Sequence, residues 1–297
     1  ARVHPRGGSL PDSVMMPWSV AHPAAPGGKA PGQHGGWLGK AYDPFRIDGD
    51  PNEPGFRVPG LGLPDGVSVE RLGERRAMLA NSNGSLDVPN WEMYQARALD
   101  ALGSAEAQGA FRIDGESDCT REMYGRNIHG QCLLMARRLV ESGVRLVTVN
   151  WHNDGRNFWD THGDNFNRLK NDLMPPADRG FSALLDDLHA RGLLDETLVV
   201  WVGEFGRTPK ITPGNAGREH WPRCYSAALA GAGIGGGRIW GASDRWGAYP
   251  ARDPVSPEDM GATILHALGV DPASEIPDPL GRPMRINTGA PLTSLFA

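Results

Sequence analysis

Carboxylate and imidazole side chains gather in three short polar segments of the sequence. The segments are WHNDGRNFWDTHGDN, GEFGRTPK and GREHWP. Within them we single out four candidate metal ligands, Asp160, His162, Glu204 and His220. Two carboxylates and two imidazoles form a mixed oxygen and nitrogen set that suits zinc, manganese or iron, and it contains too many imidazoles for a calcium site. The sequence therefore predicts a divalent metal site, with zinc as the favoured ion.

Each of these residues also has a plain structural explanation. A single histidine in a loop is more often exposed or structural than a ligand, so only the combination points to a metal. Arg207 lies in a tight GRTP turn, where its planar guanidinium could hold a phosphate, a sulfate or a carboxylate. It could equally form an ion pair with Glu204 in its own loop. His152, Asp154 and Asp164 are spare ligand candidates in the first segment.

Buried strands interspersed with helical patterns are expected to position these segments. Residues 144–150 (VRLVTVN) and 197–202 (TLVVWV) are rich in β-branched and apolar residues, and residues 225–229 form a third short run. Because we expect each run to follow a helix of crossover length, we expect three neighbouring parallel strands in one sheet, with helices on both faces. Ligands of such sheets lie beyond the carboxyl ends of the strands, where the polar segments lie.

Turn and cap residues set the limits of the predicted helices. Residues 120–142 show helical spacing, with irregularities expected at Gly125 and Gly130, and Gly143 supplies the left-handed stop. Residues 256–259 (SPED) combine an N-cap serine, a proline in the first turn and a capping-box acid. A further helix is therefore predicted to begin there.

Composition divides the chain into three regions. Gly (40) and Pro (25) are concentrated early in the chain, so we expect residues 1–65 to be an irregular wrapping segment, with a disordered linker as the alternative. Residues 66–118 are expected to be a helical insertion, and residues 119–297 to be the α/β domain.

Charge and hydropathy exclude some classes of partner. With 30 Lys and Arg against 35 Asp and Glu, the net charge of −5 gives no basic surplus for nucleic acid. No apolar stretch reaches the length of a membrane span. The three cysteines form no CxxC pair, and their odd number argues against a complete disulfide framework.

Long motifs across the chain resemble a known bacterial family. They include YGRNIHGQCLLMARRLVESGVRLVTVNW, WDTHGDNF, LLDDLHARGLLDETLVVWVGEFGRTPKI and GREHWPRCYSAALAGAGIGGG, with GGWLGKAYDPF and GERRAMLA upstream. The chain resembles the family called domain of unknown function 1501, which in turn is similar to the alkaline phosphatase and sulfatase superfamily. The resemblance implies an alkaline-phosphatase-like α/β fold with a mostly parallel, helix-covered sheet. It also implies an exported protein, periplasmic or extracellular, because family members commonly begin with a twin-arginine-type signal; this chain shows no such signal.

The resemblance also implies roles for individual residues. In the superfamily an Asp and His pair, an Asp and His doublet, and a final His bind the metals. Asp160 and His162 match the pair, Glu204 stands at the Asp of the doublet, and His220 matches the final His. Phe205 occupies the place of the doublet's His and so removes one ligand. The superfamily's opening strand, with its metal-binding Asp and its Ser, Thr or Cys nucleophile, has no counterpart near the start, so the chain is expected to be a fragment.

The function implied is that of a metal-dependent hydrolase of phosphate or sulfate esters. Its substrate would be a small molecule or a polysaccharide ester, and Arg207 would act as an oxyanion clamp in catalysis. The nucleophile segment is not expected in this chain. The alternative is a non-catalytic exported binding or scaffold protein that retains the fold and a structural metal, and the presence of Phe205 favours it.

Overall fold

The structure is a computed structural model that describes residues 9–21, 28, 30–63, 66–82, 91–151 and 158–296. These residues form a mixed α/β fold with a small parallel sheet, short antiparallel strand pairs and several helices. The chain divides into two compact units, residues 1–152 with 179–184, and residues 153–178 with 185–297. Within the described ranges, no helix combines the length and the apolar character that crossing a membrane requires.

The first unit contains the parallel sheet. Strand β1 (Ser13–Met16) lies between β2 (Phe45–Arg46) and β3 (Leu146–Val149), and both neighbours run parallel to it. Val14 and Met16 are fully buried in the core of this unit. The prediction of an irregular segment over residues 1–65 therefore overlooked two strands. The strand SVMM has only three consecutive apolar residues and lies among glycines and prolines, which hide its strand character.

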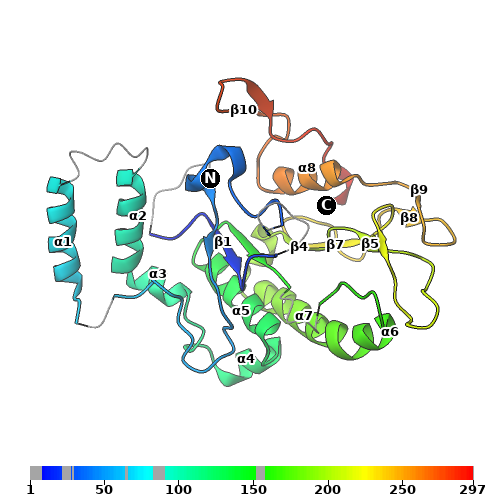
Figure 1. The fold of residues 1–297 in the computed structure, drawn as a ribbon, viewed down its shortest axis with the longest axis horizontal. Coiled ribbons are helices and arrows are strands. Elements are labelled where there is room, and N and C mark those ends of the chain that lie inside the picture. Colours follow the sequence, from blue (N-terminus) through cyan, green and yellow to red (C-terminus); the bar gives the residue numbers. More distant parts are fainter. Residues whose placement is uncertain are drawn as a thin grey trace. The chain divides into compact units, whose positions relative to one another are not determined.

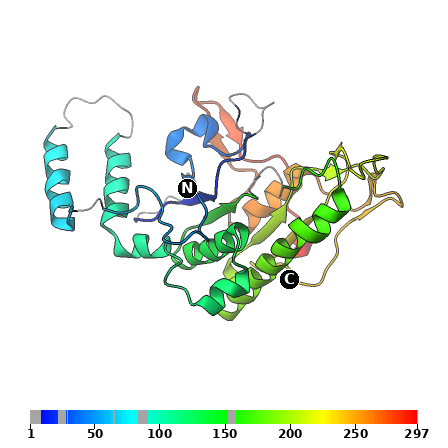
Figure 2. The same ribbon diagram turned by 60° about the horizontal axis from the view of Figure 1, so that its bottom comes forward.

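Among the described residues, five complete helices lie in the first unit. They are α1 (Val69–Ser82), α2 (Trp91–Gly103), α3 (Ala105–Ala110), α4 (Asp118–Tyr124) and α5 (Ile128–Glu141), with the short 3-10 turns η2 (Gly36–Leu38) and η3 (Lys40–Tyr42). Helices α1 and α2 lie side by side (Figures 1 and 2), and α5 contacts both β3 and α4.

The single helix predicted over residues 120–142 is interrupted at Gly125. This glycine has a φ of 95° and ends α4, and Asn127 then caps α5 through its side-chain oxygen. Gly130 lies inside α5, where a Cβ would stand 2.1 Å from the carbonyl oxygen of Tyr124. Glycine at this position therefore lets the end of α4 approach α5 closely. Gly143, also at a φ of 95°, follows α5 as predicted.

The second unit contains short antiparallel pairs. They are β4 (Val199–Val202) with β7 (Ala227–Ala230), β5 (Gly206–Arg207) with β6 (His220–Trp221), β8 (Ala242–Ser243) with β9 (Pro250–Arg252), and β10 (Glu275–Pro277) with β11 (Pro283–Arg285). The helical elements are α6 (Asn165–Arg168), the π-helical turn η4 (Leu169–Leu173), α7 (Met174–Ala190), η5 (Leu194–Glu196), α8 (Pro257–Ala267) and η6 (Thr293–Leu295), and α7 also contributes residues 179–184 to the first unit.

The prediction of three neighbouring parallel strands is wrong. Strand β3 pairs with β1, whereas β4 and β7 pair with each other in antiparallel orientation. Two parallel strands that are neighbours in a sheet need a crossover connection, which is usually a helix. Between β4 and β7 the chain forms only the short strands β5 and β6, so it returns alongside β4 in the opposite direction. Leu146 of β3 is 51 % exposed, so this strand also lacks the expected cover on both faces.

Helix α8 begins where the capping pattern predicts. The Ser256 side chain accepts a hydrogen bond from the backbone N–H of Asp259 at 3.0 Å, and the Asp259 carboxylate accepts one from the N–H of Ser256 at 3.2 Å. Pro257 occupies the first helical position, where its missing N–H costs nothing.

Candidate metal centre

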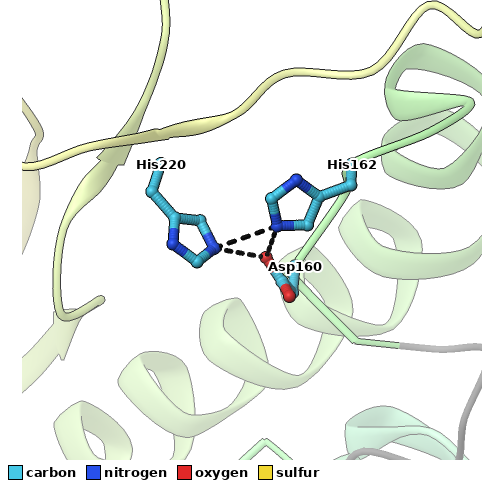
Figure 3. A group of neighbouring side chains, drawn as sticks. All are labelled: Asp160, His162 and His220. Atoms are coloured by element: carbon cyan, nitrogen blue, oxygen red, sulfur yellow. Dashed lines mark hydrogen bonds and ion pairs between the residues drawn. The ribbon is translucent and has the colours of Figure 1, made fainter. Parts of the chain in front are cut away.

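Three of the four predicted ligands lie together in the second unit. Asp160 and His162 lie in the loop before α6, and His220 belongs to β6. Figure 3 shows the three side chains pointing toward one another from these two segments. The Nε2 atoms of His162 and His220 each lie 2.9 Å from Oδ1 of Asp160, and they lie 3.0 Å from each other. The three residues thus form a possible metal-binding group.

The dimensions of this triangle suit a metal after a small opening. Zinc binds nitrogen and carboxylate oxygen at about 2.0–2.2 Å, and tetrahedral angles at those lengths place the ligand atoms about 3.4 Å apart. The observed sides of 2.9–3.0 Å need to widen by only a few tenths of an ångström. The three side chains are 43–46 % exposed, which leaves room for water or a substrate atom at the open side. Two imidazoles and one carboxylate are also the protein ligands of some catalytic zinc sites.

Hydrogen bonds across two loop segments bring the ligands together. The N–H of Asp164 donates to the carbonyl of Asn215 at 2.7 Å, and the N–H of Arg218 donates to the carbonyl of Thr161 at 3.2 Å. The side-chain amide of Asn215 donates to the carbonyl of His162 at 3.1 Å. Residues 161–164 are therefore attached to the segment that leads into β6, although about fifty residues separate them in sequence.

Arg207 forms its ion pair with Asp160. Its guanidinium also donates to the carbonyl of Arg218 at 3.1 Å, and the Arg207 side chain is only 15 % exposed. Partial burial alone would raise the pKa of the Asp160 carboxyl, but hydrogen bonds from Arg207 and His220 outweigh it and hold the pKa below its ordinary value. Asp160 is therefore ionised at neutral pH, as a metal ligand must be.

Glu204 does not join the group of three. It is exposed and makes no hydrogen bond or ion pair within the part of the chain that the structure describes. The predicted pairing of Glu204 with Arg207 is replaced by the pairing of Arg207 with Asp160. The next residue, Phe205, packs its ring against His220 with centroids 4.6 Å apart and an angle of 48° between the planes. An apolar ring thus covers one side of the His220 imidazole.

The comparison with protein families covers nearly the whole chain. The model of the family described as Protein of unknown function (DUF1501) matches residues 4–296. The chain belongs to this family. No curated protein and no solved structure matches it. The three clustered residues of this DUF1501 member all lie inside the matched range.

One residue that lies at this site of the DUF1501 member was not predicted from the sequence. The carboxylate of Glu219 lies 2.7 Å from Nδ1 of His162. A glutamate between an arginine and a candidate ligand in GREHWP has the pattern of a solvated surface charge. The one sequence feature that could have pointed to Glu219 is its position directly before His220, because a residue beside one ligand often lies near the other ligands.

The spare candidates of the first polar segment have separate outcomes. Asp164 accepts a hydrogen bond from the side-chain amide of Asn167 at 2.7 Å and lies outside the clustered group. His152 and Asp154 lie outside the residues that the structure describes.

Proposed function

We propose that this chain carries the metal centre of a hydrolase that cleaves phosphate or sulfate esters, with an alkaline-phosphatase-like arrangement of ligands. Asp160, His162 and His220 would hold one divalent ion, and zinc suits their donor atoms best. The observation that carries the proposal is the approach of both Nε2 atoms to a single oxygen of Asp160, each at 2.9 Å. Small-molecule and polysaccharide esters are the proposed substrates.

Each protein group has a distinct part in this proposal. A bound ion would polarise the ester oxygen and lower the pKa of a coordinated water. The two histidines and Asp160 would bind the ion, and their exposure leaves an open side for the ester. The contacts of Arg207 support a positioning role toward Asp160 more strongly than the predicted oxyanion clamp, because its guanidinium is mostly buried against protein acceptors. Glu204, the fourth predicted ligand, has an exposed side chain with no partner among the described residues. As a fourth ligand it would close the open position, so we assign it to the metal only in the non-catalytic alternative.

The rival function is a non-catalytic exported binding or scaffold protein with a structural metal. Phe205 favours it, because an apolar ring lies against His220 and supplies no further ligand to the metal. However, structural zinc sites are closed and four-coordinate, whereas catalytic sites keep an open position. Side chains that are 43–46 % exposed fit the open type better, so we place the hydrolase first.

The test begins with metal binding. Zinc affinity and stoichiometry are measured for the wild type, His220→Ala and the control His189→Ala at neutral to mildly alkaline pH, because ligation needs deprotonated imidazoles. His189 is exposed on α7 and has no side-chain contact among the described residues. Loss of a hydrogen-bond partner behind a metal ligand typically weakens metal binding by about 10- to 100-fold. His220→Ala removes a ligand itself, so its zinc affinity should fall by more than that. His189→Ala should bind zinc as the wild type does.

The second step is activity. A panel of phosphate and sulfate esters is assayed with the protein, with and without a chelator. Turnover that disappears with the chelator and returns with zinc supports the hydrolase. Zinc binding without turnover on any ester would favour the scaffold function, and a wild type that binds no metal would reject the centre itself.

A further inference from the structure

We propose that Glu219 positions His162 for metal binding by holding the hydrogen on Nδ1 and so leaving Nε2 free to coordinate. The inference deepens the proposed metal centre and rests on it. It starts from the 2.7 Å contact between the Glu219 carboxylate and Nδ1 of His162. On the other side of the same ring, Nε2 faces Asp160 and His220 at 2.9 and 3.0 Å.

The chemistry of the two partners decides which nitrogen carries the hydrogen. An ionised carboxylate can only accept a hydrogen bond. Both nitrogens of His162 face a carboxylate, but Oδ1 of Asp160 already accepts from Arg207 and His220, so the ring hydrogen belongs on Nδ1, toward Glu219. A neutral imidazole has one N–H, and Nε2 is then left with its lone pair. Metal-binding histidines commonly donate their second nitrogen to a carboxylate in this way, and the contact fixes both the tautomer and the orientation of the ring.

Both ends of the contact have an anchored backbone. The N–H of Glu219 donates to the Thr208 hydroxyl at 3.1 Å, and the N–H of Thr208 donates to the carbonyl of Glu219 at 2.8 Å. The carbonyl of His162 accepts from the side chain of Asn215 at 3.1 Å. Two side chains therefore meet from fixed backbones, and Glu219 is the group that selects the orientation of the ring.

The exposure of Glu219 separates this role from a role in folding. Its side chain is 55 % exposed and that of His162 is 43 % exposed. Exposed ion pairs contribute little to stability. Removing the Glu219 carboxylate should therefore change metal binding strongly and thermal stability weakly, whereas a residue with a purely structural role would show the reverse.

The first experiment compares Glu219→Gln and Glu219→Ala with the control Glu196→Gln. Glu196 is an exposed carboxylate of the same unit with no side-chain partner among the described residues. Zinc affinity is measured by competition with a chromophoric chelator. We expect a loss of about 10- to 100-fold for Glu219→Ala, a smaller loss for the isosteric glutamine, and none for the control. Melting temperatures of the metal-free proteins should change by less than about 3 °C.

The second experiment reads the tautomer without any metal. Long-range ¹H–¹⁵N correlation spectra of the metal-free protein, with both imidazoles neutral, should show His162 protonated at Nδ1 in the wild type. In Glu219→Ala the Nε2–H form should gain population. The His189 ring should be the same in both proteins.

The outcomes distinguish this inference from the proposed function. A wild type that binds no zinc rejects the metal centre. A wild type that binds zinc, together with a Glu219→Ala variant of unchanged affinity and unchanged His162 tautomer, overturns only the role of Glu219. A reduced affinity with a shifted tautomer and an unchanged melting temperature supports the positioning role.

Discussion

The backbone of Gly217 lies directly against the carbonyl oxygen of His162. A Cβ built on Gly217 would stand 1.7 Å from that oxygen, a separation that no real pair of these atoms shows. Any side chain at this position must push the segment that carries the third ligand away from His162. The glycine is therefore required by close approach of two backbones rather than by an unusual φ.

We predict that Gly217→Ala separates the ligands of the candidate centre. A displacement of about 1 Å can cost about 100-fold in a site that depends on orientation, so zinc affinity should fall by about that factor. Gly236→Ala is the matched control, because a Cβ there meets nothing within 4 Å. Equal zinc affinities in the two variants would show that the contact between Gly217 and His162 does not hold the ligands together.

A second prediction concerns the buried charges of the first unit. Glu116 is 10 % exposed and forms ion pairs with Arg137, at 2.9 Å, and with Arg138. Burial alone would raise the pKa of Glu116, but the two guanidinium groups outweigh it and lower the pKa. Because the pKa of Glu116 is lower in the folded protein than in the unfolded chain, ionised Glu116 stabilises the fold at pH values above its unfolded pKa. This stabilisation is lost as the pH falls through the folded pKa.

Glu116→Gln should therefore reduce the free energy of unfolding by about 1–3 kcal/mol at pH 7. The difference from the wild type should shrink as the pH falls through the acidic range, because the wild-type carboxyl then becomes neutral as well. Urea unfolding at several pH values measures this. Glu106→Gln, on an exposed carboxylate of α3, is the control and should change little. A constant difference across the pH range would contradict the assignment.

The candidate site was predictable because its ligands follow a chemical pattern. Asp160 and His162 lie two residues apart, and His220 lies in the third polar segment, so donor atoms suited to one metal could be recognised without coordinates. Their convergence depends on hydrogen bonds such as that from Asn215 to His162, which no local pattern encodes. Glu219 was missed for the same reason, since its function depends on a contact made across 57 residues.

The fold was predictable where the signals are local. Ser256 and Asp259 define the start of α8 correctly because a capping box is complete within four residues. The pairing of strands is a non-local property, and the two errors about strands occurred there. β1 is a short apolar run among glycines and prolines, and the direction of β7 relative to β4 depends on the absence of a helix between them.

A third prediction concerns the reactivity of the three thiols. All three cysteines are free; Cys119 is exposed, Cys224 is partly buried and Cys132 is buried. Burial raises the pKa of the Cys132 thiol well above its ordinary value, and Asp50 adds to this effect. Only the thiolate reacts readily with a disulfide reagent. We expect Cys119 to be labelled first, Cys224 more slowly, and Cys132 only after unfolding, as measured by mass spectrometry of timed samples. Labelling of Cys132 in the native protein at the rate of Cys119 would contradict its burial.

The last prediction tests whether Arg207 controls the charge state of Asp160. Burial of Asp160 opposes its ionisation, and the hydrogen bonds from Arg207 and His220 reverse this effect. In Arg207→Met the burial remains while one of the two favourable contacts is lost, so the pKa of Asp160 should rise toward or above its ordinary value. Because the pKa of Asp160 is depressed in the wild type, ionised Asp160 contributes stability above the unfolded pKa, and this contribution is lost as the pH falls.

The carboxyl ¹³C shift of Asp160, followed by pH titration of the metal-free protein, measures the change directly. Arg223→Met is the control, because Arg223 is exposed and has no side-chain contact among the described residues. A titration curve of Asp160 that is the same in the wild type and in both variants would show that Arg207 does not set its ionisation.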